Sequence, residues 1–194
     1  MQTENPPDEP LVAELQSYKE QFEANSRDAQ DLVAGLDDTQ FNWRPAAGRW
    51  SIAECLAHIN IAGQMYLTVF DRSIKRARAA NLPFEAGPFR HGVFGKLFLR
   101  ATEPPAKIKV KAPKLIAPLP EHLLAVVIPA YVSLHDQLIR RLSDANGLNL
   151  VRVKVVSPFS RLFRFSLGHA FAITAAHERR HLWQARQVKN DPGF

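Results

Sequence analysis

The chain has 194 residues, 46% of them hydrophobic and 23% charged, a composition typical of a globular protein and unlike that of disordered or fibrous chains. Its single cysteine, Cys55, excludes an intramolecular disulfide, and no run of about 18 apolar residues is present that could cross a membrane. The formal net charge is +6, but the basic residues between 107 and 114 are not interleaved with aromatic side chains, so we expect no nucleic-acid binding.

Nothing in the sequence divides the chain into two units, so we expect one domain over residues 1–194, with residues 1–9 flexible. The first ten residues are polar and acidic and lack the basic and apolar regions of a secretory signal. Together with the single cysteine, this favours a cytoplasmic location.

Apolar residues at three- and four-residue steps predict a first helix within residues 11–36. Residues 37–50 break this rhythm with Pro45 and Gly48 and are interpreted as a connection. A second helix begins at Ser51 and runs to about residue 81. Ser51 and Glu54 have the spacing of a capping box, which specifies the start of this helix.

Residues 82–120 hold much of the proline and glycine of the chain and predict a long insert that crosses between two helices. A short helix over 93–99 and a strand-like piece over 107–111 are expected within it. Helical periodicity returns over residues 121–145 and ends at Asn146-Gly147.

Alternation over residues 148–165 predicts an extended segment, and a fourth long helix follows over 166–188. The predicted fold class is therefore all-α, a four-helix bundle with a long irregular crossover between the second and third helices. Because long crossovers permit several packing orders, sequential helices need not be antiparallel neighbours.

Two histidines of the fourth helix, His177 and His181, are four residues apart, so they lie on one helix face about one turn apart. His58, at the edge of the apolar face of the second helix, is the natural third ligand. A lone core histidine is usually structural, but the pair favours a divalent metal site, because imidazole suits zinc, nickel, copper or iron. The pattern His-Glu-x-x-His also occurs in zinc peptidases, but the downstream extension of that family is missing here.

Three motifs carry a family resemblance: Asn-Trp-Arg-Pro at 42–45, Gly-Arg-Trp-Ser-Ile-Ala-Glu at 48–54 leading to His58, and His-Glu-Arg-Arg-His-Leu-Trp-Gln at 177–184. With them the chain resembles the DinB/YfiT-like superfamily, four-helix proteins that bind a divalent metal through three histidines. The resemblance covers most of the chain and implies that His58, His177 and His181 are the metal ligands. The insert over 82–120 departs from compact members of the family.

The resemblance implies two classes of function. Some relatives are thiol-dependent transferases or isomerases, so we expect a metal-dependent enzyme, such as a thiol S-transferase or a hydrolase of small substrates. Zinc or nickel is the expected metal, and a low-molecular-weight thiol is the expected co-substrate. The alternative is a noncatalytic metal-binding protein or a stress-related interaction protein.

Glu178 lies in the apolar arc of the fourth helix, where an unpaired carboxylate would be costly. It could orient a ligand histidine, act as the catalytic general base, or pair with Arg44 or another basic residue. Supporting or pairing roles rank above catalysis, because the residue after a ligand is rotated by about 100° on a helix.

Apolar side chains in the insert suggest a homodimer, although they could equally fold back onto their own core. They are Phe84, Phe89, Phe94, Leu97 and Phe98.

Overall fold

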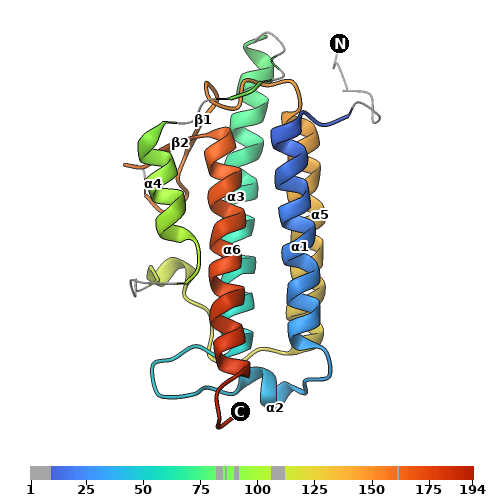
Figure 1. The fold of residues 1–194 in the computed structure, drawn as a ribbon, viewed down its shortest axis with the longest axis vertical. Helices are drawn as coiled ribbons and strands as arrows, with labels where there is room; N and C mark the ends of the chain where they lie inside the picture. The colour runs from blue at the N-terminus through green and yellow to red at the C-terminus, as the bar shows by residue number, and fades with distance from the viewer. Residues whose placement is uncertain (1–9, 82–84, 86, 90–91, 106–111, 161) are drawn as a thin grey trace.

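The protein is a helical bundle in a computed structural model that describes residues 10–81, 85, 87–89, 92–105, 112–160 and 162–194. The predicted flexible segment 1–9 lies outside the described residues. Four long helices confirm the predicted all-α bundle, and two shorter helices pack beside them (Figure 1). The long helices are α1 (Ala13–Val33), α3 (Ile52–Ala79), α5 (Leu124–Ala145) and α6 (Leu167–Lys189), and the short ones are α2 (Asp38–Asn42) and α4 (Val93–Thr102).

The packing order of the long helices differs from simple up-and-down order. Helix α3 packs against α5 and α6, and α1 packs against the same two helices, so α1 is diagonal to α3. Helices α1 and α6 run in one direction and α3 and α5 in the other (Figure 1). The crossover from α3 to α5 must therefore return along the length of the bundle, which explains its size.

The start of α3 is fixed by the predicted capping box. Ser51 Oγ accepts from the Glu54 amide at 3.1 Å, and the Glu54 carboxylate accepts from the Ser51 amide at 2.9 Å. Arg44 donates twice to the same carboxylate, at 2.7 and 2.8 Å, and once to the Pro120 carbonyl at 3.1 Å. The first turn of α3 is thus joined to the end of the crossover.

The crossover contains the predicted short helix, which is longer than expected and packs against α6 as α4. Gly95 permits this contact, because a Cβ there would lie 2.0 Å from the ring of His169. Phe89 and Phe98 pack against the core, whereas Leu97 is 66% exposed. These two phenylalanines thus fold back onto their own chain, and the homodimer stays a prediction.

Part of the insert cannot be compared with its prediction. The strand-like piece at 107–111, Phe84 and the side chain of Phe94 lie outside what the structure describes. The described part of the insert also holds a 3₁₀ turn, η1 (Lys114–Ile116), which packs on α3.

Two local structures go beyond the sequence prediction. The segment 37–50 contains α2, whose N-cap Asp37 forms a capping box with Gln40. The extended segment before α6 folds back as an antiparallel hairpin of β1 (Lys154–Val156) and β2 (Arg164–Ser166). Among the described residues, no helix is long and apolar enough to cross a membrane.

Candidate metal centre

The three predicted ligand histidines come together between α3 and α6, toward the end of the bundle where α3 begins. His58 lies in the second turn of α3, and His177 and His181 lie one turn apart, at and just beyond the middle of α6. One ligand atom from each of the three rings lies within 4.8 Å of the others, so the cluster could hold a metal ion.

The spacing of the ring nitrogens suits a common metal. Nε2 of His177 lies 3.3 Å from Nε2 of His58 and 3.2 Å from Nε2 of His181. Two ligands at the zinc–nitrogen distance of about 2.0–2.1 Å, separated by a tetrahedral angle, are themselves about 3.3 Å apart. The donor set therefore fits zinc, and imidazole ligands equally suit nickel, so the geometry leaves the identity of the metal open.

A backbone carbonyl orients His58. Nδ1 of His58 lies 2.8 Å from the carbonyl oxygen of Ile116 in η1, so Nδ1–H is the donor and the Nε2 lone pair faces the cluster. Metal-binding histidines commonly hold their second ring nitrogen in this way, which fixes the tautomer. The crossover thus supplies a supporting contact to the cluster.

The surroundings keep all three imidazoles neutral, the form that binds a metal. Burial lowers the pKa of His58, and the Ile116 hydrogen bond only partly offsets this. Burial, followed by the neighbouring His58 and Arg180, lowers the pKa of His177 to about 3. Burial lowers the pKa of His181 well below its usual value. His177, His58 and Arg180 lower it further, and a hydrogen bond with Gln184 opposes these effects.

Access to the cluster differs between the three rings. His58 and His181 are buried, whereas His177 is half-buried. The ring of Trp50 covers part of the cluster, with centroids 4.9 Å from His58 and 5.6 Å from His181. The cluster therefore reaches toward solvent on the His177 side.

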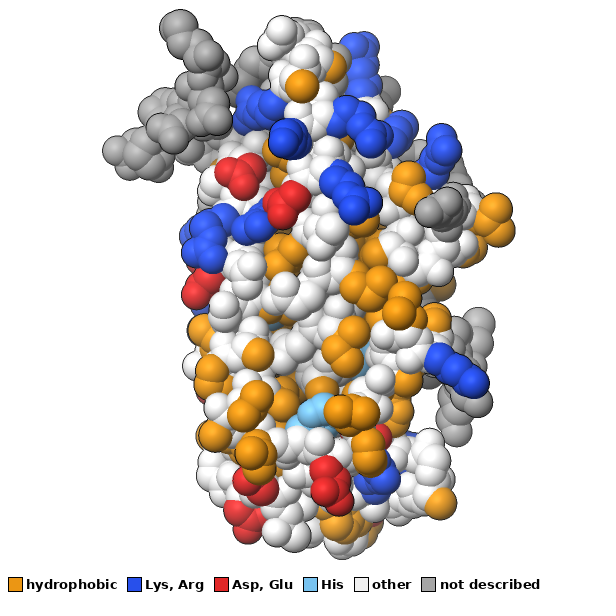
Figure 2. Space-filling view, turned by 180° about the vertical axis from the view of Figure 1, so that it is seen from behind, with side chains coloured by type: hydrophobic (Ala, Val, Ile, Leu, Met, Phe, Trp, Pro, Cys, Tyr) orange, Lys and Arg blue, Asp and Glu red, His pale blue; other side chains and the backbone are white. Residues whose placement is uncertain are grey.

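The surface around this end of the bundle is apolar. On the face seen in Figure 2, hydrophobic side chains gather over the lower half, where α3 and α5 begin, and Lys and Arg gather toward the upper end. Four large apolar side chains at the end of the crossover and the start of α5 are 59–71% exposed: Leu115, Leu119, Leu123 and Val126.

Comparison with known proteins agrees with this architecture. Residues 21–185 match the family described as the DinB superfamily. The chain belongs to the DinB superfamily. No curated protein and no solved structure matches the chain. The matched range includes all three histidines of the cluster, so the DinB resemblance seen in the sequence motifs is confirmed.

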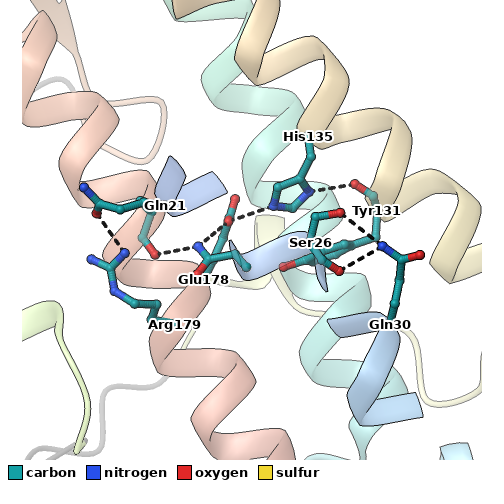
Figure 3. A network of polar contacts seen from close by, with 9 residues as sticks. Gln21, Ser26, Gln30, Tyr131, His135, Glu178 and Arg179 are labelled. Atoms are coloured by element: carbon teal, nitrogen blue, oxygen red, sulfur yellow. Dashed lines mark hydrogen bonds and ion pairs between the residues drawn. The ribbon is translucent and has the colours of Figure 1, made fainter. Parts of the chain in front are cut away.

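In this DinB-superfamily chain, Glu178 does not join the three histidines. Its carboxylate is 1% exposed, and Oε2 accepts from Nδ2 of Asn25 at 2.8 Å and contacts Nε2 of His135 at 3.0 Å (Figure 3). The basic partner of Glu178 is therefore His135, while Arg44 pairs with Glu54. The pairing role ranked higher from the sequence agrees with these contacts, and the catalytic role of Glu178 stays a prediction.

The other reactive or charged side chains near the cluster have structural partners. Arg179 forms an ion pair with Glu103 just beyond α4 and donates to Gln21 of α1. Arg180 donates to the Ala101 carbonyl at 3.3 Å. Cys55 is fully buried, and burial raises the pKa of its thiol, which agrees with a packing role.

Sequence reasoning missed three supports of these sites. Asn25 occupies the apolar stripe of α1 and His135 that of α5, and a polar residue in such a stripe is a signal that could have been followed. The contribution of Ile116 had no signal, because it comes from the backbone.

Proposed function

We propose that this protein is a divalent-metal-dependent enzyme that acts on a small substrate, with His58, His177 and His181 holding the ion. The spacing of their three Nε2 atoms carries the proposal. No fourth His, Cys, Asp or Glu joins this group among the residues that the structure describes. Catalytic zinc sites keep three protein ligands and an open position, whereas structural zinc sites use four.

The reaction that we propose is transfer of a low-molecular-weight thiol to an electrophile, with hydrolysis of a small substrate as the second candidate. A divalent ion held by the three histidines would supply Lewis-acid chemistry, which lowers the pKa of a thiol or of water. The chain itself orients the ligands: the Ile116 carbonyl fixes the tautomer of His58, and Trp50 shields one side of the cluster.

Elemental analysis of the purified protein, followed by titration of the metal-free protein with zinc and nickel, tests the metal site. We expect about one ion per chain. A screen of low-molecular-weight thiols with a chromogenic electrophile, and of small esters and amides, then tests turnover with and without metal.

Each outcome of this experiment is informative. Turnover that needs both metal and thiol supports the transferase, and turnover that needs metal alone supports the hydrolase. Stoichiometric metal without turnover favours the alternative of a noncatalytic metal-binding protein. A protein that binds neither zinc nor nickel contradicts the whole proposal.

A further inference from the structure

A second group of polar side chains lies inside the bundle, next to the histidine cluster in sequence but on another face of α6. Asn25 of α1, His135 of α5 and Glu178 of α6 are 4%, 2% and 1% exposed. Asn25 also donates to the Ala175 carbonyl at 3.1 Å. The network therefore joins three of the four long helices through the residue that follows His177.

The contacts of His135 require a proton on or between the pair. Its Nδ1 lies 2.8 Å from the Tyr131 carbonyl oxygen and its Nε2 lies 3.0 Å from Oε2 of Glu178, so both ring nitrogens face acceptors. A neutral imidazole has one N–H and can donate to only one of them. A doubly protonated His135 facing a Glu178 carboxylate satisfies both contacts.

Such a pair is an inefficient way to stabilise a core. Removing two charges from water costs several times the strength of an ordinary hydrogen bond, and well-packed apolar side chains often stabilise a protein as much or more. Buried polar groups are best attested where they select one register of packed helices. The network is therefore better explained by the position that it gives α6 than by its contribution to the stability of the bundle.

The packing face of α6 gives a reason for contacts that fix the position of this helix. Large side chains such as Phe171 and Leu182 pack on this face, but five alanines lie between them, and small side chains fix the rotation and height of a helix only weakly. The buried alanines are Ala170, Ala172, Ala175, Ala176 and Ala185.

The metal cluster is sensitive to the rotation of α6. A ligating imidazole nitrogen lies about 6–7 Å from the helix axis, so a rotation of about 20° moves it by roughly 2 Å. Ligand distances in metal sites tolerate deviations of only about 0.2 Å. A small rotation of α6 would therefore separate His177 and His181 from His58.

We propose that Asn25 and His135 are positioning residues of the metal site, which hold α6 by the Glu178 carboxylate and so set His177 and His181 opposite His58. The proposal rests on the metal-binding function proposed above. It gives Glu178 a role through the position of its helix, without contact with a substrate.

The test compares variants of the network with a packing variant. Asn25→Ala and His135→Leu remove network contacts, whereas Leu138→Ala makes a cavity one turn away on α5, where Leu138 is fully buried. Cobalt(II) affinity and its visible spectrum are measured where urea titration shows each variant folded. We expect the network variants to bind cobalt(II) about 10–100-fold more weakly, the range known for partners of metal ligands, and Leu138→Ala to stay within about 2-fold.

Conservative substitution and the metal-free protein complete the test. If His135→Leu does not fold, His135→Gln, which retains one donor, takes its place. We expect His135→Gln to lose less cobalt(II) affinity than the double variant Asn25→Ala/His135→Gln. In the metal-free protein, ¹⁵N chemical shifts of the three cluster imidazoles should change in the network variants and not in Leu138→Ala. Equal behaviour of the network and packing variants in both measurements would overturn the proposal.

The two proposals fail separately. A wild-type protein that does not bind cobalt(II) contradicts the metal-dependent function, while the imidazole shifts of the metal-free variants still decide whether the network positions α6.

Discussion

Two clusters of polar side chains lie inside the same bundle, and they are built on opposite principles. In the network of Asn25, His135 and Glu178, nitrogens of Asn25 and His135 meet the same carboxylate oxygen. In the cluster of His58, His177 and His181, three neutral rings direct nitrogens toward one another. The first group pairs Oε2 of Glu178 inside the chain, although Oε1 has no hydrogen-bond partner among the residues described. The second group offers lone pairs to something outside the chain.

The electrostatics of the two clusters differ in the same way. Burial lowers the pKa of His135, but the charge and hydrogen bond of Glu178, with smaller effects of the Tyr131 carbonyl and Asp136, outweigh it and raise the pKa overall. No carboxylate opposes the effect of burial on His177, whose pKa falls to about 3. A neighbouring carboxylate thus raises the pKa of His135, whereas burial and the neighbouring His58 imidazole lower the pKa of His177, and only neutral rings suit a metal.

Replacing one ring of the metal cluster should have the largest effect. In His181→Ala we expect zinc affinity to fall by more than about 100-fold, beyond the loss caused by removing a hydrogen-bond partner of a ligand. Isothermal titration calorimetry measures it. His122→Ala, which removes a ring outside the cluster, is the control and should bind as the wild type does. Full zinc affinity in His181→Ala would show that the three rings do not form the metal site.

Breaking the paired network should reduce stability rather than metal stoichiometry. Glu178→Leu leaves His135 buried without its counter-ion, and we expect the free energy of unfolding to fall by about 3–5 kcal/mol. Glu178→Leu combined with His135→Leu should recover much of the loss. Urea unfolding measures both. As a control, Glu103→Gln breaks the partly exposed pair with Arg179 and should cost less than about 1 kcal/mol. Additive losses in the double variant would show that the two side chains are not coupled.

The pH dependence of stability should report His135. Its pKa in the folded protein is raised above the unfolded value of about 6.5, so its stabilising contribution is complete below that pH. The contribution is lost as the pH rises through the raised pKa. We expect the difference in unfolding free energy between wild type and His135→Leu to shrink as the pH rises above about 6.5, as urea titrations at each pH would show. A difference that grows with pH would contradict the charged pair.

The smallest effect is expected at the edge of the network. Tyr131 is fully buried, and its hydroxyl has no hydrogen-bond partner among the residues described. Its backbone carbonyl and its ring contact His135, with ring centroids 4.4 Å apart, and Tyr131→Phe retains both contacts. We expect this substitution to stabilise the protein by up to about 1 kcal/mol, because an unpaired buried hydroxyl is unfavourable. A loss of stability in thermal unfolding would show that the hydroxyl has a partner.

The sequence predicted local structure best where short-range chemistry specifies it. The capping box at Ser51 and Glu54 identified the start of α3, and Asn146-Gly147 identified the end of α5. The capping box of α2 has equally local signals, Asp37 and Gln40, but was overlooked beside Pro45 and Gly48. The order of the helices could not be predicted, because the crossover is long enough to reach either end of the bundle.

For the two polar clusters, too, the sequence predicted local features and missed contacts that depend on helix packing. The spacing of His177 and His181 on one helix predicted their pairing. The place of His58 at the edge of the apolar face of the second helix suggested it as the third ligand, and the family resemblance implied the same three residues. The partners of Glu178 were not predicted, because Asn25 and His135 meet it only through the packing of α1, α5 and α6. Motifs thus indicated which residues form the metal cluster, while the supporting contacts depend on tertiary structure.

The hydrogen bond from His58 to the Ile116 carbonyl couples two events that are distant in sequence. An ion held at Nε2 would withdraw electron density from the ring and make Nδ1–H a better donor, so docking of η1 and metal binding would be thermodynamically linked. Linkage is reciprocal: whatever free energy the ion adds to that docking, a cut in the chain beside η1 removes from metal affinity. A hydrogen bond of this kind is worth about 0.5–1.5 kcal/mol in total, so cleavage of the crossover should weaken metal binding by at most about 10-fold.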